Sequence, residues 1–276
     1  MLQVARLSPK LLADSKDLVV DFLHREQQDG AFRDRAGNPD LYYTVFGLEC
    51  LRALSAGLPS GAASFLSTFG AGDDLDLVHV SSLVRCWANV ERAVPQAATI
   101  AAHLENLRNP DGGYGTLYNC FLAVGAYQDL QIPIPRPAEL LSCIHKLRSA
   151  DGAFANHAGS PIGQTSATAA AVGLLRTLNA PIPAGIDEWL LRQRHESGGF
   201  FAAPMAPVPD LLSTATALHA LVSLKAPIES IREPALDFLD TLWTTRGGFL
   251  GSWADDILDC EYTYYGLLSL GYLSLS

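Results

Sequence analysis

Six stretches of this chain have the length of a helix and are nearly free of polar residues beyond their first turn. They read PDLYYTVFGLECLRAL (39–54), LDLVHVSSLVRCWANV (75–90), GTLYNCFLAVGAYQDL (115–130), GQTSATAAAVGLLRTL (163–178), PDLLSTATALHALVSL (209–224) and LDCEYTYYGLLSLGYL (258–273). A helix that is apolar all round is buried on all sides. The segments between them, such as IDEWLLRQRHE (186–196), are apolar on one face only. The pattern therefore predicts an inner layer of buried helices and an outer layer of amphipathic ones.

A glycine–aromatic turn recurs along the chain and precedes the buried segments. It reads DGAF (29–32), DGGYG (111–115), DGAF (151–154), SGGFF (197–201) and RGGFLG (246–251), with a weaker copy, FGAGDD, at 69–74. A spacing of about 40–50 residues is typical of repeat architectures, whereas strands would need a turn signal every 8–12 residues or so. We therefore predict one all-α domain over residues 1–276, an α6–α6 toroid of six helical hairpins around a central cavity.

Composition and charge narrow the class of partner. The chain is 49% apolar and 17% charged, with a formal net charge of -10. An acidic protein is not attracted to nucleic acid or to anionic membranes. The start has no signal-peptide pattern, and no apolar run is long enough to span a bilayer. The cysteines, which form no CxxC pair, are Cys50, Cys86, Cys120, Cys143 and Cys260. We expect buried free thiols and a cytoplasmic location.

Three segments carry a family resemblance: NPDLYYTVFGLECL (38–51), IGQTSATAAAVGLL (162–175) and DILDCEYTYYGLLSL (256–270). With the glycine turns, they resemble the β subunits of protein prenyltransferases, most closely the Rab geranylgeranyltransferase type, and the β domain of squalene–hopene-type cyclases. The resemblance covers nearly the whole chain. It implies inner helices that begin at one mouth, a deep isoprenoid pocket and, in the prenyltransferases, a helical partner subunit. Both branches share the turns, so the turns indicate a fold more than a reaction.

The prenyltransferase zinc site is not retained. The resemblance implies an Asp, a Cys two residues later and a His on the sixth inner helix; here these positions hold Asp210, Leu212 and Tyr262. Zinc needs the missing thiolate and imidazole donors. Tyr118 replaces the family's diphosphate-binding Arg, and AAPMAPVP (202–209) has no basic residue. We expect neither a zinc cofactor nor zinc-dependent protein prenyl transfer.

The cyclase branch uses D-x-D-D-T-A at the start of an inner helix, and PDLLSTA (209–215) shares this frame. Only Asp210 matches an acid of that motif, so a cyclase would need a displaced acid, and Asp210 and Asp259 are our candidate catalytic residues. The stretch DDILD also spells D-D-x-x-D, which leaves magnesium at Asp255, Asp256 and Asp259 as an alternative. Acids at a helix N-terminus stabilise the helix without a metal, so we expect no metal.

A D-x-x-x-T register recurs at Asp40, Asp210 and Asp259. The slot before the threonine holds Tyr43, His79, Tyr118, Ala167, Ser213 and Tyr262, and we expect it to face the cavity near its mouth. One turn deeper, small residues at Gly47, Ala171, Ala217 and Gly266 predict a void. The predicted ligand-contacting residues are Tyr43, Phe46, His79, Tyr118, Phe121, Ser213, Tyr262 and Tyr265.

An elongated apolar ligand is the natural occupant of such a cavity. The sequence favours an isoprenoid- or terpenoid-handling protein and leaves open whether it is an enzyme. The alternatives are a non-catalytic lipid-binding or protein-interaction scaffold and a terpene cyclase with a displaced acid. A carbohydrate-active toroid that uses Asp210 and Asp259 as paired carboxylates is a further hypothesis.

Overall fold

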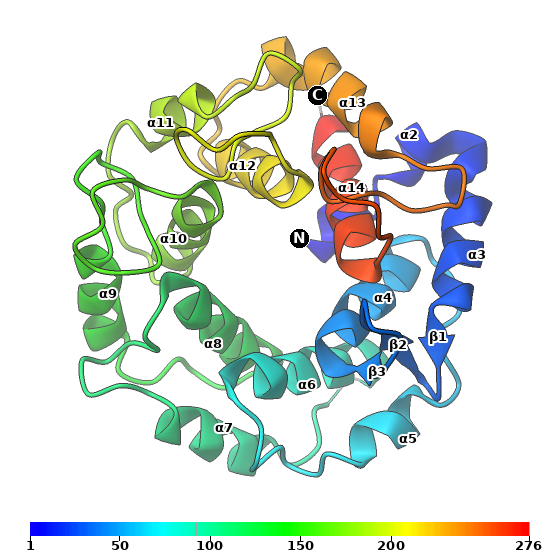
Figure 1. Ribbon diagram of the computed structural model, residues 1–276. Helices are drawn as coiled ribbons and strands as arrows, with labels where there is room; N and C mark the ends of the chain where they lie inside the picture. Colours follow the sequence, from blue (N-terminus) through cyan, green and yellow to red (C-terminus); the bar gives the residue numbers. More distant parts are fainter. Residues whose placement is uncertain (92, 276) are drawn as a thin grey trace.

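The computed structural model describes residues 1–91 and 93–275 and shows two concentric rings of helices (Figure 1). The inner ring consists of α4 (Leu41–Ala53), α6 (Leu77–Val90), α8 (Leu117–Asp129), α10 (Thr165–Thr177), α12 (Leu211–Ser223) and α14 (Cys260–Leu273). Each inner helix contacts the next, and α14 contacts α4, so the ring closes. The prediction of an all-α toroid is confirmed.

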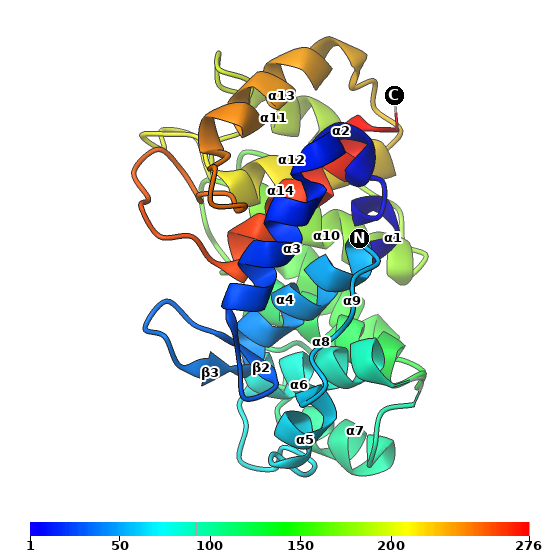
Figure 2. The same ribbon diagram turned by 90° about the vertical axis from the view of Figure 1, so that its right-hand side faces the viewer.

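The outer ring lies behind the inner one and shields its apolar helices from solvent (Figure 1). It consists of α3 (Lys16–Arg25), α5 (Ala62–Ser67), α7 (Ala97–Asn106), α9 (Pro137–Lys146), α11 (Ile186–Arg192) and α13 (Glu229–Leu242). In side view the inner helices run across the thickness of the ring (Figure 2). No helix within the described ranges is both long and apolar enough to cross a membrane.

The start of the chain packs on the inner ring. Two short helices, α1 (Leu2–Ala5) and α2 (Pro9–Leu12), and a 3₁₀ turn, η1 (Ala13–Ser15), precede α3. The first of them contacts α4 and α14. A Cβ placed on Gly271 would lie 2.2 Å from the Val4 carbonyl oxygen, so only glycine allows this close approach of α1 to α14.

The glycine turns pair locally with their own repeat. The first forms a three-stranded antiparallel sheet of β1 (Gln27–Gln28), β2 (Ala31–Arg33) and β3 (Pro39–Asp40), and later turns form single bridges such as Arg194↔Phe200. Gly198 has a φ of +96°, and a Cβ there would lie 1.9 Å from the Pro234 carbonyl oxygen. Gly198 is therefore required both by its backbone conformation and by its contact with outer helix α13.

The D-x-x-x-T register connects each turn to its inner helix. In the repeat that contains Asp210, the carboxylate caps α12 by accepting from the Ser213 N–H at 2.7 Å. The Thr214 hydroxyl donates to the Asp210 carbonyl at 2.7 Å and accepts from the Phe200 N–H at 2.9 Å. Thr44 and Thr263 make the same pair of bonds in the first and last repeats. The register is therefore a structural device that satisfies buried backbone groups.

The prediction of a void beside small inner-helix residues is wrong at Gly47 and Gly266. A Cβ on Gly47 would lie 2.3 Å from the Phe32 ring, and one on Gly266 would lie 2.4 Å from the Phe249 ring. The phenylalanines of the glycine turns therefore fill this space. Ala171 and Ala217 are also fully buried. The physical reason is that these positions face the turn behind the helix and not the centre of the ring.

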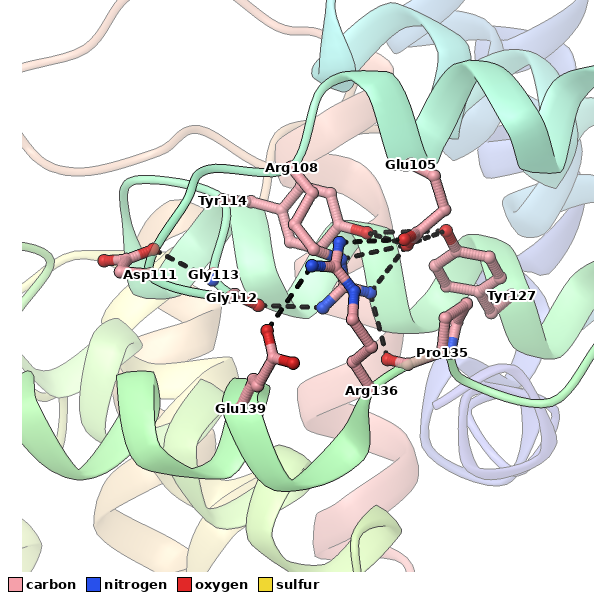
Figure 3. Close-up of polar contacts among 10 residues, drawn as sticks. All are labelled: Glu105, Arg108, Asp111, Gly112, Gly113, Tyr114, Tyr127, Pro135, Arg136 and Glu139. Carbon is pink, nitrogen blue, oxygen red and sulfur yellow. Dashed lines mark hydrogen bonds and ion pairs between the residues drawn. The ribbon is translucent and has the colours of Figure 1, made fainter.

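A polar hub joins three neighbouring helices on the outer side of the ring (Figure 3). Glu105 of α7 accepts from Arg108, from the Tyr127 hydroxyl of α8 at 2.9 Å and from Arg136 at 3.0 Å, where α9 begins. Burial opposes ionisation of Glu105, but these donors outweigh it and lower its pKa. The fully buried Arg108 side chain also donates to the Gly112 carbonyl. Every contact of this hub serves the packing of the helices.

Candidate functional site

The inner helices all begin at one end of the ring, which we call the mouth. Hydrogen bonds tie the starts of successive helices there: Tyr118 N–H to Asn156 Oδ1 at 3.0 Å, Thr165 N–H to the Ala202 carbonyl at 2.8 Å, and Leu211 N–H to the Gly251 carbonyl at 2.8 Å. At the seam between the first and last repeats, Arg35 contacts Asp255 and Asp259, each at 2.7 Å. From α8 round to the first repeat, the mouth is therefore a rim of linked loops that precede the inner helices.

The centre of the ring is accessible to solvent. Inner helices have ring neighbours on both sides and outer helices behind them, so the remaining face of each is turned toward the centre. Partly exposed positions recur at the second, sixth and ninth residues after the N-cap, and Val45 and Phe121 are partly exposed at the fifth. At mid-helix depth the recurring positions are Phe46, Leu122, Gly125, Ala170, Gly173, Thr216, His219 and Tyr265. The wall is aromatic on α4 and α14 and carries small residues on α10.

The predicted ligand slot combines two different helix faces. Tyr43 and Ser213 lie three residues after their N-caps, whereas Tyr118 lies two residues after Thr116, the N-cap of α8. Ser213 is only 2% exposed, and its hydroxyl donates to Asp210 Oδ2 at 2.8 Å. Its prediction as an inward-facing slot residue is therefore wrong, because the side chain is used in capping α12.

The other residues of the slot lie at the rim of the mouth. His79 Nδ1 lies 2.7 Å from Asp76 Oδ1, within the first turn of α6. The Arg35 guanidinium lies 5.3 Å from the centre of the Tyr262 ring. Burial raises the pKa of Tyr43 and of Tyr262 to about 12, so both phenols stay neutral at physiological pH.

Side chains from three inner helices converge just inside the mouth. We call them the mouth cluster: Tyr42 and Phe46 from α4, Tyr118 from α8, and Glu261 and Tyr265 from α14. The Tyr42 hydroxyl donates to Glu261 Oε1 at 2.6 Å. The Phe46 ring lies 5.0 Å from the Tyr42 ring and 5.7 Å from the Tyr265 ring, between ring centres. Tyr118, which is 38% exposed, faces the Tyr42 hydroxyl from across the ring.

Within the mouth cluster, Glu261 has the environment of an acid. Burial raises its pKa to about 7, although the Tyr42 hydroxyl and the positive charge of Arg35 act in the opposite direction. Burial also raises the pKa of Tyr42 and Tyr265, so these phenols donate hydrogen bonds without ionising. The arrangement can hold a protonated carboxyl against aromatic rings near neutral pH.

Comparison with known proteins places this ring in a family. The sequence matches the family described as the prenyltransferase alpha-alpha toroid domain over residues 6–79 and 168–275. The chain belongs to this toroid family. No curated protein matches the sequence significantly.

Solved structures share the fold of this toroid at low sequence identity. Protein geranylgeranyltransferase-I from Candida albicans, complexed with GGPP, is 17% identical with a TM-score of 0.55, over 98% of this chain and 83% of that one. A variant of the type II terpene cyclase MstE from Scytonema, with its product merosterolic acid A, is 12% identical with a TM-score of 0.64, over 96% and 97%. A glycosidase variant in complex with glucose is 12% identical with a TM-score of 0.58, over 98% and 96%. These likenesses establish the toroid fold alone.

Both aspartates that the sequence suggested as catalytic are N-caps in this toroid. Asp210 accepts from the N–H and the hydroxyl of Ser213, and Asp259 accepts from the Tyr262 N–H at 2.8 Å and from Arg35. Burial raises the pKa of both carboxyls, against the effect of these bonds. Their catalytic role stays a prediction, while their structural role is visible in the contacts.

The residues at the mouth do not suit the metals of the family. Leu212 and Tyr262 offer zinc neither thiolate nor imidazole. The guanidinium of Arg35 lies between Asp255 and Asp259, where a magnesium ion would have to bridge them. Within residues 1–91 and 93–275, no group of three or more His, Cys, Asp or Glu side chains is arranged to hold a metal ion.

A second group of charged and polar side chains lies at the end of the inner wall opposite the mouth. Arg85 of α6 contacts Glu49 at 3.1 Å and Asp129 at 2.5 Å, and so connects α4, α6 and α8. His219 hydrogen-bonds to the Tyr272 hydroxyl, and burial lowers the pKa of His219 to about 4. A hollow of about 380 Å³ lies beside Asp129, at the C-terminal ends of these helices and away from the mouth cluster.

The structure thus brings together Phe46, Tyr118 and Tyr265 of the predicted ligand contacts. Phe121 of α8 is partly exposed and its ring lies near Gly173 of α10, away from the mouth cluster. Sequence reasoning missed Tyr42 and Glu261. The available signal was Glu261 itself, an acid inside the first turn of an otherwise apolar inner helix.

Proposed function

We propose that this toroid binds an elongated isoprenoid or related terpenoid in its central opening, with one end of the ligand against the mouth cluster. The observation that carries the proposal is the asymmetry of the inner wall. Phe46 of α4 and Tyr265 of α14 present partly exposed aromatic surface on adjacent helices, while α10 carries the small residues Ala170 and Gly173. Apolar, concave surface with a few convergent polar groups is typical of small-molecule sites.

Family membership supports this ligand class in a general way, since protein geranylgeranyltransferase-I and the terpene cyclase MstE share the fold. Zinc-dependent transfer of the isoprenoid to a protein is not part of the proposal. The residues that would hold zinc and neutralise a diphosphate are replaced by Leu212, Tyr262 and Tyr118. A helical partner subunit and a cytoplasmic location remain predictions.

Binding can be tested directly with farnesol, geranylgeraniol and squalene by calorimetry or by native mass spectrometry. We expect micromolar binding of at least one of these probes and no binding of glucose. Binding of glucose alone would contradict the proposal and favour a carbohydrate-active toroid.

A matched pair of variants locates the ligand. Ala170→Trp adds a large ring at a partly exposed position on the inner wall, and Ala102→Trp adds the same ring at an exposed position on outer helix α7. We expect the first to weaken isoprenoid binding more than tenfold and the second to leave it unchanged, with both proteins helical by circular dichroism. Equal binding by both variants would place the ligand outside the central opening.

A further inference from the structure

We propose that the central opening has a polar subsite at the end opposite the mouth, where His219 of α12 and Arg85 of α6 donate hydrogen bonds to a neutral oxygen of the ligand. This inference rests on the proposed function and narrows its ligand class to isoprenoids that carry a carbonyl or hydroxyl oxygen at the end away from the mouth cluster. It assigns His219 as the residue that determines this specificity.

The residues of the subsite lie at one depth on the inner wall. Glu49, Arg85 and His219 are each the ninth residue after the N-cap of their helix. Tyr42 and Glu261 of the mouth cluster are the second residue after theirs. About 10 Å of helix therefore separates the two layers, at a rise of roughly 1.5 Å per residue. A ligand that contacts both layers is elongated.

These side chains surround a shared space inside the ring. Figure 1 shows the start of the chain within the ring of inner helices, and Figure 2 shows it at the end away from the mouth loops. Burial lowers the pKa of the Met1 amino group, an effect that Glu49 opposes and Arg85 strengthens. Besides burial, this amino group lowers the pKa of His219. Groups from α4, α6 and α12 therefore converge on the same space.

His219 offers a hydrogen-bond donor to this space. Burial lowers its pKa to about 4, so the imidazole is neutral near pH 7 and carries a proton on one ring nitrogen only. Nδ1 hydrogen-bonds to the Tyr272 hydroxyl, and burial raises the pKa of Tyr272, so the phenol keeps its proton and donates it. Nδ1 is therefore the acceptor and Nε2 carries the proton. In the described part of the chain, Nε2 has no hydrogen-bond partner.

Arg85 offers the second donor. Its Nη1 contacts Glu49 and its Nε contacts Asp129, whereas Nη2 hydrogen-bonds to none of the described residues. A Cβ on Gly125 would lie 3.3 Å from Nη2, so the guanidinium extends along the inward face of α8.

The charges around Arg85 favour a neutral ligand group. Glu49 and Asp129 already balance the positive charge of Arg85, so the guanidinium brings no excess charge for an anion such as a diphosphate. A carbonyl oxygen has two lone pairs and can accept from two donors at once. A buried donor that stays without an acceptor costs free energy, so the subsite discriminates against a hydrocarbon end. It suits a ketone, an aldehyde or an alcohol.

A matched pair of probes tests this specificity: farnesylacetone, which is an isoprenoid ketone, and the hydrocarbon in which CH₂ replaces its carbonyl. His219→Phe keeps a ring and removes the Nε2 donor. We expect it to weaken calorimetric binding of the ketone about three- to tenfold, as loss of one neutral hydrogen bond does, and to change binding of the hydrocarbon less than about twofold. His145→Phe, at an exposed position on outer helix α9, is the control and should leave both affinities unchanged.

A spectroscopic measurement on the unaltered protein does not depend on the folding of a variant. The carbonyl stretch of ¹³C-labelled farnesylacetone moves to lower wavenumber when the oxygen accepts a hydrogen bond. We expect the bound ketone to absorb at lower wavenumber than the same ketone in hexane. The shift should shrink in His219→Phe, with the variant helical by circular dichroism.

Each outcome decides the inference. A bound ketone that absorbs as it does in hexane would overturn it, and so would unchanged ketone binding in His219→Phe. An equal loss of affinity for ketone and hydrocarbon would also overturn it, because such a loss reports damage to the wall and not a lost hydrogen bond. In these three cases the probes bind, and the proposed function stands. Absence of binding of both probes to the unaltered protein would overturn the proposed function, and the inference with it.

Discussion

Two glutamates on the inner wall of the same ring meet opposite environments. Glu49 of α4 is 4% exposed and lies 3.1 Å from the guanidinium of Arg85, which also reaches Asp129. Glu261 of α14 accepts from the Tyr42 hydroxyl, and among the described residues it forms no ion pair. A carboxylate paired with a guanidinium holds neighbouring helices together. One placed among aromatic rings is shifted toward its neutral form. Both residues are glutamates, so the difference between their environments comes from the partner that a neighbouring helix supplies.

The largest expected effect is on stability, from loss of the ion pairs that Arg85 forms. Arg85→Met leaves Glu49 and Asp129 without their cation, and the expected loss in the free energy of unfolding is about 3 kcal/mol, at the low end for a buried pair because Arg85 is 37% exposed. Urea denaturation measures it. Arg192→Met, an exposed arginine on α11, is the control and should change stability by less than about 0.5 kcal/mol. A loss of equal size in both variants would remove the structural role of the Arg85 pair.

The next effect is a pH dependence that belongs to Glu261. Its pKa is about 7 in the folded protein, above the ordinary value of 4.5, so the folded state holds this proton more tightly than the unfolded state. Ionisation of Glu261 therefore lowers the free energy of unfolding as pH rises from about 4.5 through 7, and this destabilisation is complete above that range. Glu261→Gln should remove this pH-dependent destabilisation.

The measurement is the difference between the unaltered protein and Glu261→Gln in urea denaturation at pH 5 and at pH 8. Relative to the unaltered protein, the variant should gain about 2 kcal/mol between these two pH values. Glu188→Gln should gain nothing. A gain of the same size in Glu188→Gln, or none in Glu261→Gln, would show that Glu261 titrates as an ordinary surface carboxyl does.

A smaller effect isolates the hydrogen bond that defines the environment of Glu261. Tyr42→Phe removes one phenol, and we expect a change in unfolding free energy of about 1 kcal/mol. The same variant should raise the pKa of Glu261, because the hydroxyl favours the carboxylate. NMR titration of the ¹³C-labelled glutamate side chains measures this pKa. A fall in the pKa would mean that the hydroxyl stabilises the protonated form instead.

The smallest expected effect on stability concerns the aspartates that the sequence suggested as catalytic residues. Asn caps a helix about as well as Asp, so Asp210→Asn should cost less than about 0.5 kcal/mol. A loss of more than about 0.5 kcal/mol would show that the Asp210 carboxylate does more than cap α12. Asp259→Asn also keeps the cap, but it weakens the contact with Arg35 and should be the less stable of the two.

Much of the fold could be predicted from the sequence because its signals are local. The apolar segment around Leu48 is buried on every side, and the turn around Gly30 repeats at a nearly regular spacing. The face of each helix was harder to predict. A shift of one residue between Tyr118 and Ser213 rotates a side chain by about 100°. The third and fourth inner helices have Thr116 and Gln164 as N-caps, where the other four have an aspartate. The Phe32 ring occupies the space beside Gly47 because the glycine turn folds back against α4. The periodicity of the sequence carries no information about that contact.

The sequence by itself determined that this chain forms a ring of paired helices, because all-round apolarity and repeated glycine turns act within each repeat. Only the tertiary structure decided which inner-wall carboxyl meets a guanidinium and which meets a phenol. Arg85 is 36 positions away from Glu49, and Tyr42 is 219 positions away from Glu261. Closure of the ring brings these partners together and excludes water around them, and burial and partner charge together set the pKa of a carboxyl.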